Sequence, residues 1–388
     1  MEQWKEYKLG DISKNIFAGG DASKFSCKKN KTDMYFIPIY ANAIENDGLY
    51  GYTNTAVVSE PAVTIAARGA GTGNVIYRSK PFTPIVRLIS IIPNENVNPL
   101  FLACALQLKK LSGDGSAIPQ LTVPEVRKIT INIPSLNTQN KIANFVEKIN
   151  QKITLNRRIN DNLEQQAQAL FKSWFVDFEP FKDGEFVDSE LGMIPKGWRV
   201  VCLGEVTKQV TEKVGNREDV TVLSPVNSGE LVLSEEYFTK QVFSKNLSKY
   251  LIVNPLSFAY NPARINIGSI GLNEYDFVGC VSPVYVVFKC EPNYHYFFDF
   301  YKRTAVFKDE VALRAIGGVR QSLGYDDFSL IKTIYPTPDV VAEFNNLYLK
   351  MKEVITRNDI QNNKLTTLRD SLLPKLMSGE LKINNFNR

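Results

Sequence analysis

Two long stretches of the chain carry apolar residues at alternating steps of four and three positions. The first runs from about Gln139 to Trp174 and the second from about Val341 to Leu376. They are related by a displacement of 202 positions, the interval from Trp174 to Leu376. A period of 3.5 residues sustained over about five heptads predicts two long helices that meet along a coiled-coil seam.

Asparagines interrupt the apolar seam at the centre of each stretch. They are Asn156 and Asn160 in the first stretch, and Asn358 and Asn362 in the second. A buried asparagine lowers stability unless it meets a polar partner, so such residues specify the register of a helix pair. In an antiparallel pair we expect Asn156 and Asn160 to face Asn362 and Asn358. The alternative is that the helices splay apart there and the amides are solvated.

Short apolar runs separated by turn residues fill the first third of the chain. They lie at 35–40, 62–67 and 85–92, and a helical pattern follows from Pro99 to Leu111. A last strand is expected at 129–133. This mixture predicts an α+β domain.

The third quarter of the chain repeats that order. Strand-like runs at 220–223, 256–260 and 284–290 precede one expected helix near 294–311 and a strand at 331–335. In addition, WKEYKLGDI recurs as WRVVCLGEV after 194 positions, the interval from Trp4 to Trp198. These echoes predict a pseudo-two-fold internal repeat.

The predicted architecture is α+β, with two globular domains separated by a pair of long antiparallel coiled-coil helices. The expected domains cover residues 1–134 and 179–336, the second including a linker. The expected helices occupy 135–178 and 337–388, the latter with a C-terminal tail. Antiparallel pairing follows from the duplication, because it relates the two halves by a two-fold axis.

The composition favours a globular protein inside the cell. Of 388 residues 44% are hydrophobic, which is enough to bury sizeable cores. Neither a signal-peptide pattern at the start nor an uninterrupted apolar run of about 18 residues is present, so we expect a cytoplasmic location. The cysteines form no CxxC pair, which favours reduced thiols over disulfides or a zinc site; they are Cys27, Cys104, Cys202, Cys280 and Cys290.

Few residues in the chain are suited to catalysis. The single histidine, His295, lies in the aromatic pattern NYHYFFDFYKR and is predicted to pack on the apolar side of a helix. Most metal sites and acid–base sites use an imidazole, and no GxxxxGK[ST] phosphate loop is present. The net charge of +5 is compatible with a polyanionic partner.

Four long motifs resemble those of one known family. They read ALFKSWFVDFEP from Ala169, LGMIPKGW from Leu191, YNPARINIGSIG from Tyr260 and LRDSLLPKLMSGEL from Leu368. In this order they closely resemble the specificity subunit of type I restriction-modification systems. The resemblance covers essentially the whole chain.

This resemblance implies two target recognition domains, each reading one half of a bipartite, asymmetric sequence in double-stranded DNA. It implies a non-catalytic chain that binds no metal or cofactor itself. The implied partners are two modification subunits, which methylate adenine N6, and restriction subunits that use ATP. S-adenosylmethionine, ATP and Mg²⁺ are thus expected on partner subunits, and no membrane is involved.

The glycine-rich turns of the two domains are the first candidates for DNA contact. Arg68 and Arg264 each follow a strand and precede glycines that let the backbone approach a ligand closely. The alternative is an ordinary glycine-rich turn in which the arginine caps a neighbour. Gln120 and Gln321 form a second pair, because glutamine binds adenine bidentately, and Arg320 is suited to guanine or phosphate.

Lysines and arginines on other loops are candidates for phosphate contact. In the first domain they form the short basic loop Lys28, Lys29 and Lys31, whose alternative is a solvated surface turn. In the second domain they are more scattered, at Lys213, Arg217, Lys240 and Lys245.

Aromatic residues gather where the first long helix ends. Phe171, Trp174 and Phe175 are expected to contact a partner subunit, although some rings of this region are equally suited to seating the linker into the second domain.

Two other functions fit the same pattern. A stand-alone, two-headed DNA-binding regulator would need no enzymatic partner, and a scaffold would only recruit proteins. Neighbouring genes for a methyltransferase and an ATP-dependent nuclease would separate the specificity subunit from both.

Overall fold

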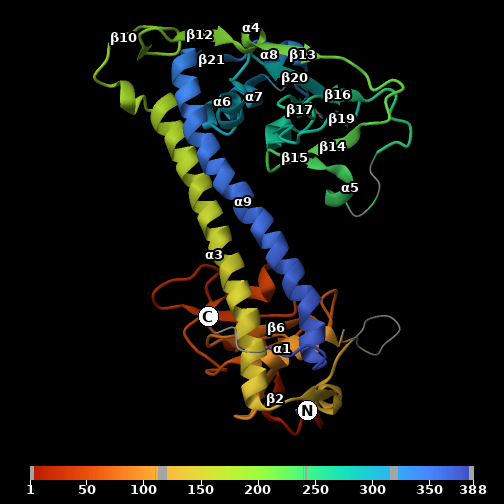
Figure 1. Ribbon diagram of the computed structural model, residues 1–388. Coiled ribbons are helices and arrows are strands. Elements are labelled where there is room, and N and C mark those ends of the chain that lie inside the picture. The colour runs from red at the N-terminus through yellow and green to blue at the C-terminus, as the bar shows by residue number, and fades with distance from the viewer. Residues whose placement is uncertain are drawn as a thin grey trace. The chain divides into compact units, whose positions relative to one another are not determined.

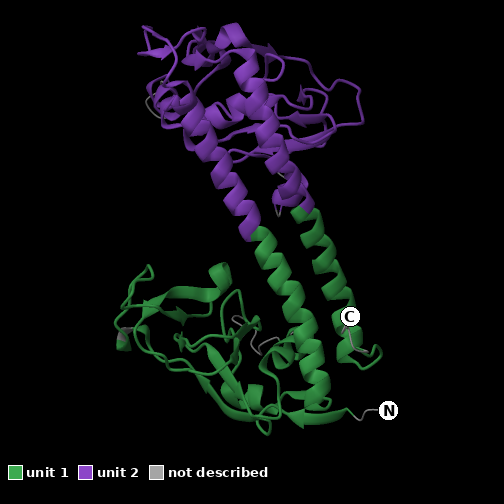
Figure 2. Ribbon diagram, turned by 60° about the vertical axis from the view of Figure 1, so that its left-hand side comes forward, with its two compact units in different colours: residues 1–157, 358–388 green, residues 158–357 purple. Residues whose placement is uncertain are grey.

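The computed structural model describes residues 4–109, 111, 120–238, 240, 243–314 and 322–383. The chain divides into two compact units, shown in Figure 2. Unit 1 comprises residues 1–157 and 358–388, and unit 2 comprises residues 158–357. Among the residues that the structure places, no helix combines the length and apolar character needed to cross a bilayer.

Two sheets build the globular part of unit 1 (Figure 1). The larger is antiparallel, whereas in the smaller one β3 pairs antiparallel with β4 and parallel with β7. In spatial order the larger sheet consists of β2 (Ser13–Ala18), β8 (Ile89–Pro93), β5 (Ala62–Ile65) and β6 (Val75–Arg78). The smaller sheet consists of β4 (Leu49–Thr53), β3 (Ile37–Tyr40) and β7 (Thr83–Pro84). Strand β5 reads AVTI and is buried on both faces, so it lies at the centre of the core.

Local sequence explains where the short helices of unit 1 begin. Helix α1 (Pro99–Leu108) starts with proline at its first position, and the Asn98 side chain accepts hydrogen bonds from the amides of Leu100 and Phe101. Helix α2 (Val123–Lys128) begins with a capping box between Thr122 and Glu125. The short 3₁₀ helices here are η1 (Ala22–Lys24) and η2 (Glu45–Gly48).

Unit 2 contains two four-stranded sheets, whose strands pair in the same order as those of unit 1 except that β16 is added at the edge of the second sheet. The first is antiparallel, and in the second β14 pairs parallel with β19. In spatial order the first sheet consists of β13 (Thr207–Val210), β20 (Val286–Cys290), β17 (Phe258–Tyr260) and β18 (Ile270–Leu272). The second sheet consists of β15 (Leu231–Leu233), β14 (Thr221–Pro225), β19 (Gly279–Val281) and β16 (Leu251–Val253).

The prediction of a single helix near 294–311 is wrong, because two helices occupy this region. Helix α6 (His295–Tyr301) ends at a turn, and α7 (Ala305–Arg314) begins after it. The Thr304 hydroxyl donates to Tyr301 O (2.7 Å) and accepts from the Phe307 amide (3.3 Å). Thr304 therefore caps a new helix instead of continuing the old one. The expected apolar side of α6 is confirmed, since its aromatic rings are at most 8% exposed.

The remaining short elements of unit 2 surround its two sheets. They are β10 (Phe186–Val187), β11 (Ile194–Pro195), α4 (Leu203–Val206), α5 (Ser234–Tyr237), α8 (Tyr325–Ser329), η3 (Glu179–Phe181) and η4 (Ile265–Ile267).

In each unit an early strand pairs with the strand that precedes a long helix. In unit 1, β1 (Lys5–Lys8) pairs antiparallel with β9 (Thr130–Ile133), with Lys5 opposite Ile133. In unit 2, β12 (Arg199–Cys202) pairs with β21 (Lys332–Tyr335), with Arg199 opposite Tyr335. The displacement of 194 takes Lys5 to Arg199, and the displacement of 202 takes Ile133 to Tyr335, so the two pairs have the same register.

The chain has two long helices, each of 40 residues. They are α3 (Leu136–Phe175) and α9 (Pro338–Met377). About half of each helix belongs to unit 1 and the rest to unit 2. Within unit 1, Arg369 Nη1 donates to Asn150 Oδ1 (2.8 Å) and Asn156 Nδ2 donates to Asn362 Oδ1 (3.0 Å). Because the residue numbers run in opposite directions, the helices are antiparallel here.

The asparagines of the seam are buried. Asn156, Asn160, Asn358 and Asn362 are at most 8% exposed, which contradicts the alternative of a splayed, solvated seam. Asn156 also donates to Gln361 Oε1 (2.8 Å), and in unit 2 Asn160 Nδ2 donates to Ile355 O (3.4 Å). The partners of Asn156 Nδ2 and Asn160 Nδ2 thus offset part of the cost of burying these amides, while Asn156 Oδ1 is buried without a partner among the described residues.

Candidate nucleic-acid interface

In unit 1, two of the predicted DNA-contacting residues lie side by side. Arg68 and Gln120 form an isolated antiparallel bridge, next to the hydrogen bond from the Leu121 amide to Ala67 O (2.8 Å). The Arg68 side chain is exposed and that of Gln120 is half-buried. Arginine and glutamine are the side chains that bind guanine and adenine edges bidentately, so the arrangement is suited to reading neighbouring bases.

The turn that follows Arg68 depends on glycine. Gly69 and Gly73 have φ angles of 86° and 85°, in the left-handed region that favours glycine. A Cβ atom on Gly73 would lie 1.9 Å from Leu111 O, so a larger residue would displace the backbone. The turn is therefore tight, and it presents Arg68 at its start.

Asn42 joins the Arg68 turn to a second turn of unit 1. Its Oδ1 accepts from the Ala67 amide (2.8 Å), and its Nδ2 donates to Val86 O. Val86 and Arg87 have φ angles of 52° and 62°, which are strained for residues other than glycine. Arg87 is exposed beside the predicted site, and the sequence pattern gave no sign of it, because its position depends on this tertiary contact.

The basic loop of unit 1 lies at a sheet edge. Lys28 exchanges two backbone hydrogen bonds with Tyr52 of β4, at 2.9 and 2.8 Å. Its side chain and those of Lys29 and Lys31 are exposed. Long, exposed ammonium groups on a fixed backbone are suited to phosphate contact.

In unit 2, Arg264 lies at the start of a turn that folds back on it. Its carbonyl accepts from the amides of Ile267 and Ser269, each at 3.1 Å, and Gly268 has a φ of 94°. The Arg264 side chain is exposed. Burial raises the pKa of Tyr285, and the Arg264 guanidinium opposes this shift, so the guanidinium lies near that phenol.

A backbone hydrogen bond joins a later segment of the chain to each arginine turn. The Leu121 amide donates to Ala67 O, one residue before Arg68, and the Leu323 amide donates to Pro262 O (3.1 Å), two residues before Arg264. The pairing of Gln120 with Gln321 stays a prediction. Arg320 and Gln321 themselves lie outside the described residues.

The scattered cations of unit 2 have different surroundings. Lys213 pairs with Leu251 through its backbone, and the side chains of Lys213, Lys240 and Lys245 are exposed. Arg217 lies 3.8 Å from Glu212 and 3.7 Å from Asp219. These carboxylates partly neutralise Arg217, so it is a weaker candidate for phosphate contact than the lysines.

Two of the aromatic residues expected at a partner interface are core residues. Phe171 and Phe175 are 4% and 7% exposed. Both rings contact Phe297 and Phe344, at centroid distances of 5.1 to 5.8 Å. Their assignment to partner contact is therefore wrong, because α6 and α9 already cover them. Trp174 is only half-buried, and its partner contact stays a prediction.

Comparisons with known proteins identify the class. Residues 1–165 match the family model described as type I restriction modification DNA specificity domain. The HindI specificity subunit of Haemophilus influenzae is 26% identical over 98% of this chain and 100% of its own length. A C-terminal putative type I specificity subunit of Mycoplasma pneumoniae is 35% identical over 31% of this chain and 82% of its own length. The crystal structure of a type I S subunit from M. genitalium has the same fold, with a TM-score of 0.60, 14% identity and coverage of 97% of this chain and 96% of that one.

These matches place the chain among the DNA specificity proteins of restriction-modification systems. The chain belongs to the family of type I specificity subunits. Members of this family are the non-catalytic components of restriction-modification complexes.

Proposed function

We propose that this chain gives a type I restriction-modification complex its DNA sequence specificity by reading a bipartite, asymmetric site. Each unit contributes one target recognition domain, and each domain reads one half-site. The two long helices form an antiparallel coiled coil that sets the spacing between the half-sites.

The matched organisation of the two units carries this proposal. Their strands pair in the same order apart from the added β16 of unit 2, and the closing pairs β1–β9 and β12–β21 have the same register under the displacements of 194 and 202. Such agreement supports an internal repeat with two similar DNA-binding surfaces. The turns at Arg68 and Arg264 differ in sequence, which supports two different half-sites.

The partners proposed from the family are two adenine-N6 methyltransferase subunits and ATP-dependent restriction subunits. This chain would position them, while S-adenosylmethionine, ATP and Mg²⁺ bind to those partners. The predicted contact at Trp174 is one candidate point of attachment. A stand-alone regulator is less well supported, because the relatives are specificity subunits of restriction enzymes.

The decisive experiment maps N6-methyladenine across the genome of cells with and without the gene. We expect one bipartite motif to be methylated in the parent, absent after deletion and restored by the intact gene. The control is a strain that carries the gene with an early stop codon. Methylation that persists after deletion, or that is lost from a continuous motif, would contradict the proposal.

A further inference from the structure

A buried lysine lies in the turn between α6 and α7 of unit 2. The Lys302 side chain is only 1% exposed. Burying an ammonium group costs several kcal/mol in lost hydration unless it is paired and hydrogen-bonded. Burial lowers the pKa of Lys302 and the adjacent Asp299 carboxylate opposes the shift.

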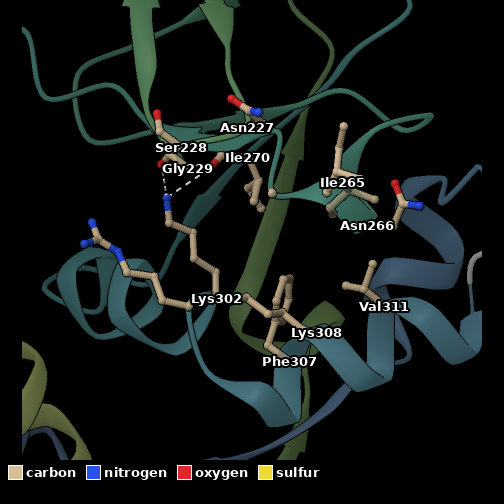
Figure 3. Close-up of a pocket in the computed structure, with 13 residues that line it drawn as sticks. Asn227, Ser228, Gly229, Ile265, Asn266, Ile270, Lys302, Phe307, Lys308 and Val311 are labelled. Carbon is tan, nitrogen blue, oxygen red and sulfur yellow. Dashed lines mark hydrogen bonds between the residues drawn. The ribbon is translucent and has the colours of Figure 1, made fainter. Parts of the chain in front are cut away.

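The ammonium has a partner for each of its hydrogen atoms. It lies 2.8 Å from Asp299 Oδ1. It also donates to Ile270 O at 2.9 Å and to Gly229 O at 2.5 Å, the two bonds drawn in Figure 3. A lysine ammonium carries three N–H donors, so these three acceptors satisfy it. Two of the acceptors are backbone carbonyls, Gly229 in the loop between β14 and β15 and Ile270 at the start of β18.

The two segments that supply these carbonyls approach each other closely. Gly268 lies in the turn that carries Arg264 and Gly271 in the following strand β18, and a Cβ atom on either would lie 2.7 Å or less from backbone atoms of residues 227–231. The buried Ser269 hydroxyl donates to Pro225 O (2.7 Å). The Ser269 amide donates to Arg264 O (3.1 Å), so Lys302 is connected to Arg264 through Ile270 and Ser269.

An open pocket of about 290 Å³ borders these two segments of unit 2. It is lined by both of them, by Lys302 and by residues of α7, including Phe307 and Val311 (Figure 3). Beside this pocket, the Lys302 ammonium spans from the end of α6 to the Gly229 and Ile270 carbonyls.

We propose that Lys302 is a positioning residue for DNA readout by unit 2. By holding the carbonyls of Gly229 and Ile270, it sets the position of the Arg264 turn and thereby the base preference at one half-site. This inference rests on the proposed function.

The test replaces Lys302 and maps the methylated motif in cells. Lys302→Met removes all three donors and keeps the aliphatic stem, while Asp299 stays paired with Arg303 Nη2 at 2.5 Å. We expect discrimination between bases in one half-site to fall on the order of tenfold, the worth of one bidentate base contact, and the other half-site to keep its preference. Arg303→Met is the matched control, because Arg303 also pairs with Asp299, and its guanidinium donates to the carbonyl and the carboxylate of that residue of α6.

Lys302→Gln is a second variant in case Lys302→Met does not fold. The glutamine side chain is one atom shorter and falls short of both carbonyls, so the same half-site should lose its preference. An unchanged motif in either folded variant would overturn the proposal for Lys302. Equal loss at both half-sites, or an equal effect of Arg303→Met, would also overturn it by showing a merely structural role. A parent strain without a bipartite motif would instead overturn the proposed function, and the Lys302 proposal with it.

Discussion

Unit 1 and unit 2 share their order of paired strands apart from the added β16 of unit 2, but they fill the space around the long helices differently. In unit 1 the helices bury mainly aliphatic residues, among them Ile142, Val146 and Leu376. In unit 2 they bury a cluster of aromatic rings that includes Phe171 and Phe344. The displacement of 202 takes Ile142 to Phe344. Equivalent positions of the two helices therefore carry an aliphatic side chain in unit 1 and an aromatic one in unit 2. Strand register and helix direction are common to both units, while side-chain volume is adjusted locally.

The largest expected effect tests whether the aromatic core stabilises unit 2 alone. Phe344→Ala should lower the free energy of unfolding of unit 2 by about 3–5 kcal/mol, and Ile142→Ala that of unit 1 by about 2–5 kcal/mol, because each leaves a cavity. One buried cysteine in each unit can report on the opening of that unit. Burial raises the pKa of Cys104 in unit 1 and of Cys280 in unit 2 to about 11. Such thiols react only when the unit opens.

The measurement is thiol labelling of the folded full-length chain. Phe344→Ala should speed labelling of Cys280 on the order of a hundredfold or more and leave Cys104 unchanged. Ile142→Ala should do the reverse. If each substitution exposes both cysteines equally, the units do not unfold independently and the comparison fails.

A smaller effect separates what the two units read. Arg264→Ala should weaken binding to the cognate site by about 1–3 kcal/mol and relax base preference at one half-site, because a bidentate contact is lost. Arg68→Ala should do the same at the other half-site. Competition binding with duplexes altered in one half-site at a time measures this. Equal losses on cognate and random DNA would remove either arginine from base reading.

The smallest effect concerns phosphate contact. Lys28→Ala should weaken binding to cognate and random DNA alike and reduce the slope of log K against log salt by about 1. Arg217→Ala should change the slope less, because Glu212 and Asp219 already lie within 4 Å of it. Salt titrations of both variants check this order, and a larger effect of Arg217→Ala would reverse the assignment.

Local patterns predicted the elements but not the contacts between them. The 3.5-residue period identified both long helices, since that signal is contained in each helix itself. The helix break at Thr304 escaped prediction, because the apolar run continues through it and the cap depends on one hydroxyl. Phe171 was assigned to a partner because its cover comes from α6 and α9, which are distant in sequence.

The candidate site shows the same limit. Arg68 and Arg264 were identified from the strand and glycines around them, whereas the bridge between Arg68 and Gln120 joins segments about fifty residues apart and leaves no local trace. Lys302 was not predicted, because it lies in the aromatic helical pattern NYHYFFDFYKR. The spacing of Asp299 and Lys302, three residues apart on one helix face, is the signal that would have pointed to it.

The pairs β1–β9 and β12–β21 have a consequence for how such chains diversify. Each pair brings the entry and the exit of a domain together, at Lys8 and Thr130 in unit 1 and at Cys202 and Lys332 in unit 2. Everything between those points is a cassette with adjacent ends. An exchange of one cassette for another would leave the paired strands and both long helices in place, so the structure permits one globular part to change without rebuilding the rest.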